Sequence, residues 1–196
     1  MSFRKLLHVV VAVYSMVLLT SCGSDSPGGG TSEFKTISIS ASASTTRLES
    51  DLLTGNTCTN SVSSGGTFST DSVDVNIVST AYPGITTALP VAIDSYTIDF
   101  IPNASMSTGT PPALSRLSGS SLGQSISAGG SLTIPVAIVP EALKVNLVNN
   151  GTIGLCSGTV YAYYALITFQ GIEVGTGTRN SIGPISLDVV FADRSK

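Results

Sequence analysis

Residues 158–169, GTVYAYYALITF, form the most regular stretch of the chain and set the expectation for its fold. On an extended strand, Tyr161 and Tyr163 fall on one face, while Ala162 and Tyr164 fall on the other. Because both faces are apolar, we expect this strand in the middle of a sheet that is covered on both sides. A second interpretation stays open, in which the face of Tyr161 and Tyr163 contacts a partner protein, as exposed apolar patches often do.

Shorter segments with the same two-residue period lie on both sides of this stretch. Apolar residues alternate with Ser, Thr, Asp or Asn over residues 37–43, 72–77, 95–100, 132–138 and 185–191. Such alternation is typical of half-buried strands, and Pro135 inside one segment predicts an edge strand or a bulge. The pattern predicts an all-β domain over residues 34–196, built as an antiparallel two-sheet sandwich.

Two segments depart from this pattern. Residues 105–131 are rich in Ser, Gly and Pro, and we expect them to form loops with at most one short strand. Loops of this length are uncommon without a purpose, so they are a candidate contact region. Residues 140–144, PEALK, predict one helical turn, the only helix that we expect after the N-terminal segment.

The N-terminus predicts export from the cytoplasm. Arg4 and Lys5 precede an apolar run over residues 6–19, and small polar residues follow it. This order of charged, apolar and small residues is typical of a secretory signal peptide. An apolar run of about 14 residues is too short to cross a bilayer as a helix, which takes about 20.

The residues before Cys22 carry a more specific signal. Leu19, Thr20 and Ser21 followed by Cys22 resemble the lipobox of bacterial lipoproteins. The resemblance implies that residues 1–21 are removed, that Cys22 is acylated, and that the lipid anchors the chain in a membrane. Gly23 follows Cys22, at the position where an Asp would keep a lipoprotein in the inner membrane. In a bacterium with two membranes, the family therefore implies the outer membrane. The alternative is an ordinary signal peptide with a cysteine near its cleavage site.

A flexible tether is expected between the anchor and the domain. Residues 23–32, GSDSPGGGTS, are rich in Gly and Ser, which is typical of a flexible coil. We therefore divide the chain into a signal peptide (residues 1–21), the acylated cysteine with its tether (residues 22–33) and the β domain (residues 34–196).

Composition excludes several classes of function. The only histidine, His8, lies in the signal peptide, and without Arg4 and Lys5 the 9 basic residues fall to 7 against 12 acidic ones. A formal charge of −5 without a basic cluster predicts no binding to nucleic acid. We expect no cofactor, because the chain has no haem-attachment motif and no glycine loop that would hold a phosphate.

The two remaining cysteines, Cys58 and Cys156, are expected in an oxidising compartment, where a disulfide between them is the simplest assignment. Two separate buried thiols are the alternative. Two cysteines so far apart, without a histidine, predict no zinc site.

The spacing of the expected strands resembles that of immunoglobulin-like domains of bacterial envelope proteins. The likeness is one of architecture alone, because the chain has no tryptophan and the span from Cys58 to Cys156 is too long for the inter-sheet disulfide of antibody domains. No binding residue is carried over from that family.

Two serine motifs match catalytic patterns only in part. Residues 119–123, GSSLG, fit G-x-S-x-G, but a nucleophile elbow needs a strand–turn–helix and a histidine that the mature chain lacks. Residues 32–35, SEFK, fit S-x-x-K without the companion motifs of that enzyme class. We predict no catalytic residue in either.

Four aspartates are candidates for carboxylate chemistry such as glycoside hydrolysis or calcium binding. Asp71 and Asp74 open one expected strand, and Asp94 and Asp99 flank another. Because each pair has an odd spacing, its members point to opposite faces of a regular strand. We expect solvated carboxylates here.

Together these patterns favour a non-catalytic, lipid-anchored binding or assembly module of the cell envelope. One alternative is an accessory subunit of an outer-membrane or surface-filament complex, with the strand of Tyr161 buried against its partner. The other is a carboxylate-dependent hydrolase, which the opposed carboxylates disfavour.

Overall fold

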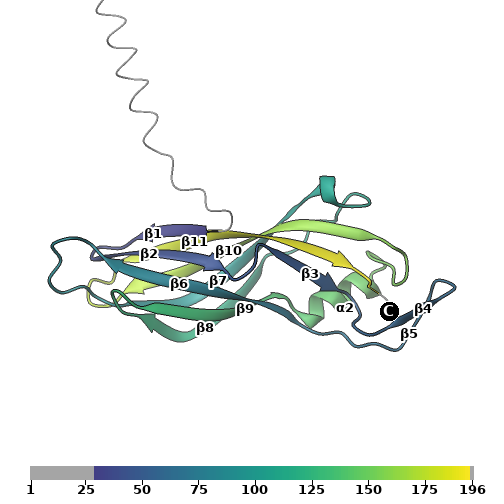
Figure 1. Ribbon diagram of the computed structural model, residues 1–196, viewed down its shortest axis with the longest axis horizontal. Helices are drawn as coiled ribbons and strands as arrows, with labels where there is room; N and C mark the ends of the chain where they lie inside the picture. Colours follow the sequence, from purple (N-terminus) through teal and green to yellow (C-terminus); the bar gives the residue numbers. More distant parts are fainter. Residues whose placement is uncertain (1–28, 195–196) are drawn as a thin grey trace, which may run out of the picture.

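A computed structural model describes residues 29–194 and folds them mainly into strands (Figure 1). Four strands form a first sheet, in the order β1 (Gly29–Glu33), β2 (Ile37–Ala43), β6 (Asp71–Ala81) and β9 (Ser131–Val139). Five form a second sheet, in the order β3 (Arg47–Asp51), β11 (Arg179–Ala192), β10 (Val160–Glu173), β7 (Val91–Pro102) and β8 (Leu117–Ile126). The remaining elements are the hairpin of β4 (Thr57–Thr59) and β5 (Val62–Ser64), the 3₁₀ turn η1 (Ala104–Met106) and the helix α2 (Glu141–Asn149).

The core lies between the two sheets. Buried and exposed residues alternate along β6, which places Val73, Val75 and Ile77 in the core. From the other sheet, β10 contributes a row of inward residues that includes Ile167 and Phe169. The alternation in the sequence therefore reflects one buried face on each sheet, and the expectation of a mostly β domain is confirmed.

Most neighbouring strands are antiparallel, but the edge of the second sheet is not. Strand β3 runs parallel to β11, with Leu48 opposite Val189. The first part of the domain thus contributes β2 to one sheet and β3 to the other. The expectation of purely antiparallel sheets is wrong at this edge, because a chain that leaves β2 and crosses to the second sheet arrives beside β11 in the parallel direction.

The last residues assigned to the flexible tether are ordered as β1, which corrects that boundary. Strand β1 pairs with β2 along its whole length, so the edge of β2 supplies its hydrogen-bond partners. A Cβ atom on Gly30 would lie 2.3 Å from the Cα atom of Gly183, so β1 packs backbone against backbone on β11. Glycine is therefore needed for this close approach. The expected signal peptide, Cys22 and residues 23–28 of the expected tether lie outside the described residues.

Strand β8 is the second correction, because it occupies ten residues of the segment expected to be mostly loop. It pairs with β7 on the outer edge of the second sheet. A Cβ atom on Gly119 would lie 2.3 Å from the ring of Tyr96. The small residues that suggested a loop therefore let this strand pass closely over an aromatic side chain.

Helix α2 follows Pro140 and extends beyond the single turn that the sequence predicts. It packs onto the domain through two buried residues, Lys144 and Leu147. Lys144 Nζ lies 2.9 Å from Asp71 Oδ2 and 2.7 Å from the carbonyl oxygen of Asp51. The helix is thereby fixed to the start of β6 and the end of β3. Over residues 29–194, no helix has the length and apolar character needed to cross a membrane.

A buried carboxylate lies at the C-terminal end of β10. Glu173 is fully buried and accepts hydrogen bonds from the backbone N–H of Thr36 (2.8 Å), its hydroxyl (2.5 Å) and the hydroxyl of Thr176 (2.6 Å). Burial alone would raise the pKa of Glu173, but the hydrogen bonds from Thr176 and Thr36 outweigh it and hold the pKa below its ordinary value. Glu173 thus joins the β1–β2 and β10–β11 turns.

Candidate functional site

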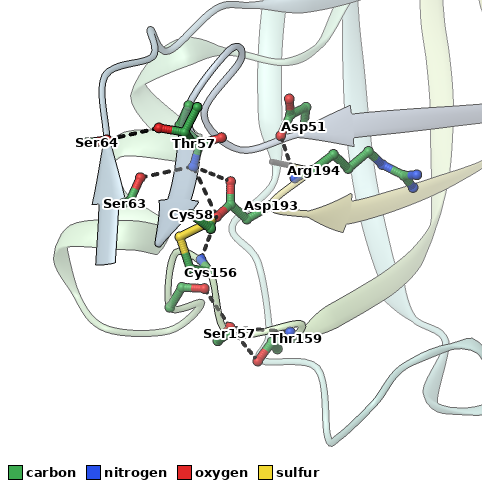
Figure 2. The surroundings of a disulfide bond; sticks show 12 residues. Asp51, Thr57, Cys58, Ser63, Ser64, Cys156, Ser157, Thr159, Asp193 and Arg194 are labelled. Carbon is green, nitrogen blue, oxygen red and sulfur yellow. Dashed lines mark hydrogen bonds between the residues drawn. A yellow bond between two sulfur atoms is a disulfide. The ribbon is translucent and has the colours of Figure 1, made fainter. Parts of the chain in front are cut away.

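Helix α2, the β4–β5 hairpin and the end of β11 lie at one end of the sandwich (Figure 1), and a disulfide joins the hairpin to a neighbouring loop there (Figure 2). Cys58 in β4 and Cys156 in the loop before β10 are joined, with their Cα atoms 5.6 Å apart. This confirms the pairing expected from the sequence. Because the two residues are 98 positions apart, the bond ties the hairpin to a loop that the chain reaches much later.

A carboxylate organises the surroundings of the disulfide (Figure 2). Asp193 accepts a hydrogen bond from the backbone N–H of Cys156 and another from Asn56 Nδ2, at 2.9 Å. Asn56 is fully buried and also donates to Ser63 in β5. Asp193 therefore links the end of β11 to Cys156 and, through Asn56, to the hairpin that contains Cys58.

The sulfur atoms and Asp193 also form the only group of three potential metal ligands within residues 29–194. Cys58 Sγ lies 3.7 Å from Asp193 Oδ2, but a sulfur in a disulfide carries no proton and makes no hydrogen bond there. Metal ions bind thiolates rather than disulfide sulfurs. In the oxidised protein this group is therefore a structural element.

A groove of about 370 Å³ opens between α2 and residues 112–117, at the same end of the sandwich. Its apolar lining includes Pro112, Leu114, Leu117, Leu143 and Leu147. Its polar lining is Ser115, Asn146, Asn150 and Thr152. The groove combines an apolar surface with a few polar groups, which is typical of binding sites, and no charged residue lines it.

Both walls of the groove are held by specific contacts. On one side, Tyr163 donates a hydrogen bond of 2.9 Å to the carbonyl oxygen of Pro112. Arg116 also makes two hydrogen bonds, of 2.6 and 2.9 Å, to the carboxylate of Asp99. On the other side, buried Lys144 fixes α2. Both walls of the groove are therefore held by contacts within the domain.

The structure corrects the candidate partner surface at Tyr161 and Tyr163. Tyr163 is only 1% exposed, and its ring packs edge-on against Phe100 and Phe191. Burial, with a smaller contribution from Tyr161, raises its pKa well above the ordinary value. Tyr161 is partly buried against the same core. This face turns inward because it packs against the first sheet. Strand β10 is central in its sheet, as the first interpretation predicts, but the expected cover on its other face is wrong at Tyr164, which is 41% exposed.

The four candidate aspartates do not form a shared site. Asp71 pairs with Lys144, while Asp74 is exposed on the first sheet. Asp94 and Asp99 lie on the second sheet, where each pairs with its own arginine.

The expectation that Asp94 and Asp99 point to opposite faces is wrong. Inward residues are Val91 and Ile93 before a bulge in β7, and Ile98 and Phe100 after it. The bulge inserts one residue and shifts the alternation, so both aspartates lie on the outer face. They are nevertheless about 16 Å apart along the strand, too far for joint catalysis.

Neither serine motif has its catalytic context. Residues 119–123 lie within strand β8 rather than at a strand-to-helix turn. Ser32 is buried in β1, and its hydroxyl has no hydrogen-bond partner in the described part of the chain, so Lys35 makes no hydrogen bond to it. The sequence interpretation missed the groove, whose only signal was the spacing of Leu and Asn residues after Pro140.

Comparison with known proteins identifies no relative: the chain matches no protein-family model and no curated protein.

Proposed function

We propose that this chain is a lipid-anchored, non-catalytic binding module of the bacterial cell envelope, with an immunoglobulin-like sandwich that presents the groove at its disulfide end. The observation that carries the proposal is this groove. Its walls are fixed by Lys144 and Tyr163, and its lining mixes leucines with amides. A rigid, partly apolar groove costs little ordering when a ligand binds.

The order of the strands supports the immunoglobulin-like part of the proposal. Strand β2 pairs with β6 in one sheet, and β3 pairs in parallel with β11 in the other. In the second sheet, β8 lies outside β7, as the added outer strands of variable-type immunoglobulin domains do in their sheet.

The position of β1 supports display of the groove away from the anchor. Strand β1 is an edge strand of the first sheet, while β9, which leads into α2, forms its other edge (Figure 1). Cys22 and Gly29 are seven positions apart, so an extended connection spans at most about 25 Å. An acylated Cys22 would therefore hold the β1 edge within this distance of the membrane, while α2 follows the strand at the other edge of the sheet.

Anchoring is tested by Cys22→Ser in the full-length chain. Two or three acyl chains hold a protein in a membrane almost irreversibly, because burial contributes about 0.8 kcal/mol per CH₂. We expect the variant to appear in the soluble fraction or as unprocessed precursor. An unchanged membrane fraction would refute the lipobox interpretation.

Binding is tested by native co-purification of the tagged lipoprotein in mild detergent, with the mass of the complex measured by light scattering. Asn146→Arg places a charge in the groove, and Asn149→Arg on the same helix is the matched control, because Asn149 is exposed outside the groove lining. We expect a partner that the first variant loses and the second retains. A partner bound equally by both would refute the groove as the binding site.

A second candidate function, an accessory subunit of an envelope complex, is favoured by a different surface. Ile101 in β7 and Tyr164 in β10 lie directly opposite each other on the outer face of the second sheet. They are 48% and 41% exposed, which is unusual for a neighbouring pair of large apolar residues. If Tyr164→Lys releases a stoichiometric partner while Asn146→Arg does not, the subunit function is correct.

A further inference from the structure

We infer that the groove beside α2 binds an extended, uncharged peptide segment of another protein, with apolar side chains at alternate positions. The inference rests on the proposed function in one respect, namely that the groove is a binding site. It adds the chemical class of the ligand.

The spacing of residues on α2 matches the repeat of an extended peptide. Leu143 and Leu147 are four residues apart, as are Asn146 and Asn150, and all four line the groove. Four residues advance about 6 Å along an α-helix, and two residues of an extended chain advance about 6.6–6.8 Å. Alternate side chains of a peptide lying along α2 would therefore meet successive leucines, while its backbone meets successive amides.

The two amide side chains are available to a ligand. Asn146 and Asn150 are exposed, and within residues 29–194 neither side chain forms a hydrogen bond. An asparagine amide offers both a donor and an acceptor, so it can pair with the C=O and N–H of one residue in an extended chain, which point to the same side. Two such amides along one line favour recognition of a peptide backbone.

The charge of the groove favours a neutral segment. Its lining holds no charged residue, and the nearest cations on its two walls already have anionic partners: Arg116 pairs with Asp99, and buried Lys144 pairs with Asp71. An anionic ligand side chain placed against Leu143 and Leu147 would lose hydration without gaining a cationic partner, because Arg116 and Lys144 are already paired.

The flanking residues of this chain do not supply the ligand. After the expected cleavage, residues 22–28 (CGSDSPG) and 195–196 (SK) flank the described domain, and neither segment has a large apolar side chain. Neither of these two segments can therefore fill a groove lined by four leucines.

The test measures binding of short labelled peptides to the mature lipoprotein in mild detergent by fluorescence anisotropy. The probe is an acetylated and amidated heptapeptide of alternating serine and leucine, with empty micelles as the background. One control peptide carries lysine in place of leucine, and another has N-methylated backbone amides. The protein variants are Asn146→Ala combined with Asn150→Ala, and Asn149→Ala as the matched control.

We expect saturable binding of the neutral peptide and at least a tenfold weaker affinity for the Asn146/Asn150 double variant, since the hydrogen bonds of both amides to the peptide backbone are lost. The N-methylated peptide should lose a similar factor, and the lysine peptide should not bind. The inference is overturned if the neutral peptide does not bind, or if it binds the double variant as tightly as the wild type. If co-purification still yields a partner that Asn146→Arg loses, the groove remains a binding site and only the ligand class is wrong.

Discussion

The buried ion pair under α2 gives the most informative prediction, because its two partners differ in exposure. The Lys144 side chain is fully buried, while the Asp71 side chain is 23% exposed. Asp71→Asn leaves the ammonium group buried without a negative partner. Loss of one partner from a buried ion pair costs about 3–5 kcal/mol. We expect a smaller loss here, about 2–3 kcal/mol, because the site is partly hydrated and the asparagine oxygen can still accept a hydrogen bond from Lys144.

The reciprocal change, Lys144→Met, should cost less. Methionine keeps the volume of the side chain and removes the charge, so Asp71 can turn to water. The variant loses the hydrogen bond to the carbonyl oxygen of Asp51, which contributes about 1 kcal/mol. In the Lys144→Met background, Asp71→Asn should then have almost no further effect on stability.

Urea unfolding of the oxidised proteins, followed by circular dichroism, measures these free energies. At a slope of about 2 kcal/mol per molar urea, Asp71→Asn should lower the midpoint by about 1 M. Asp74→Asn is the matched control, because Asp74 is an exposed residue of the same strand. The reasoning is refuted if Asp71→Asn costs no more than Asp74→Asn, or if Lys144→Met costs more than Asp71→Asn.

Three further predictions concern other contacts. Replacing Cys58 and Cys156 with Ala should lower the free energy of unfolding by up to about 4.7 kcal/mol, because a loop of about 100 residues is released; a loss below about 1 kcal/mol in urea unfolding would contradict this. The native pKa of Glu173 lies below its ordinary value, so its stabilisation is present above about pH 4.5 and is lost as the pH falls through the native pKa. Glu173→Gln should therefore reduce stability near pH 7 and flatten its decline in acid, and an unchanged acid decline would show that Glu173 is not responsible. Gly30→Ala should push β1 away from Gly183 and speed amide exchange in β1, while unchanged exchange would mean that the close contact is not needed.

The periodicity of the sequence predicted most of the strands because it records burial on one face. The segments around Ile77, Ile98 and Leu187 alternate in the sequence and are strands in the structure. The sequence did not predict strand β8, because it is rich in Gly and Ser. The reason for a small residue at Gly119 is its close contact with Tyr96, which no local pattern reveals. Strand β1 was not predicted for a similar reason, since its partner strand and Gly183 lie far from the glycine run in the sequence.

The candidate site was less predictable than the fold. Cysteine count and the expected compartment were enough to pair Cys58 with Cys156. The role of Asp193 beside them was not foreseen, because it depends on the end of β11 returning to the first hairpin. The groove likewise needs α2 and residues 112–117 to meet across a gap in sequence.

By itself, the sequence determined that the domain is built mainly of strands, that its two late cysteines pair, and that the tyrosine-rich strand is central. These properties follow from composition and from the two-residue period, which act locally along the chain. Only the tertiary structure decided which face of that strand is buried, that a bulge turns Asp94 and Asp99 to the same side, and that α2 and residues 112–117 enclose a neutral groove. Each of these depends on strand register and on contacts between distant segments, and a one-residue shift in register reverses which side chains face the core.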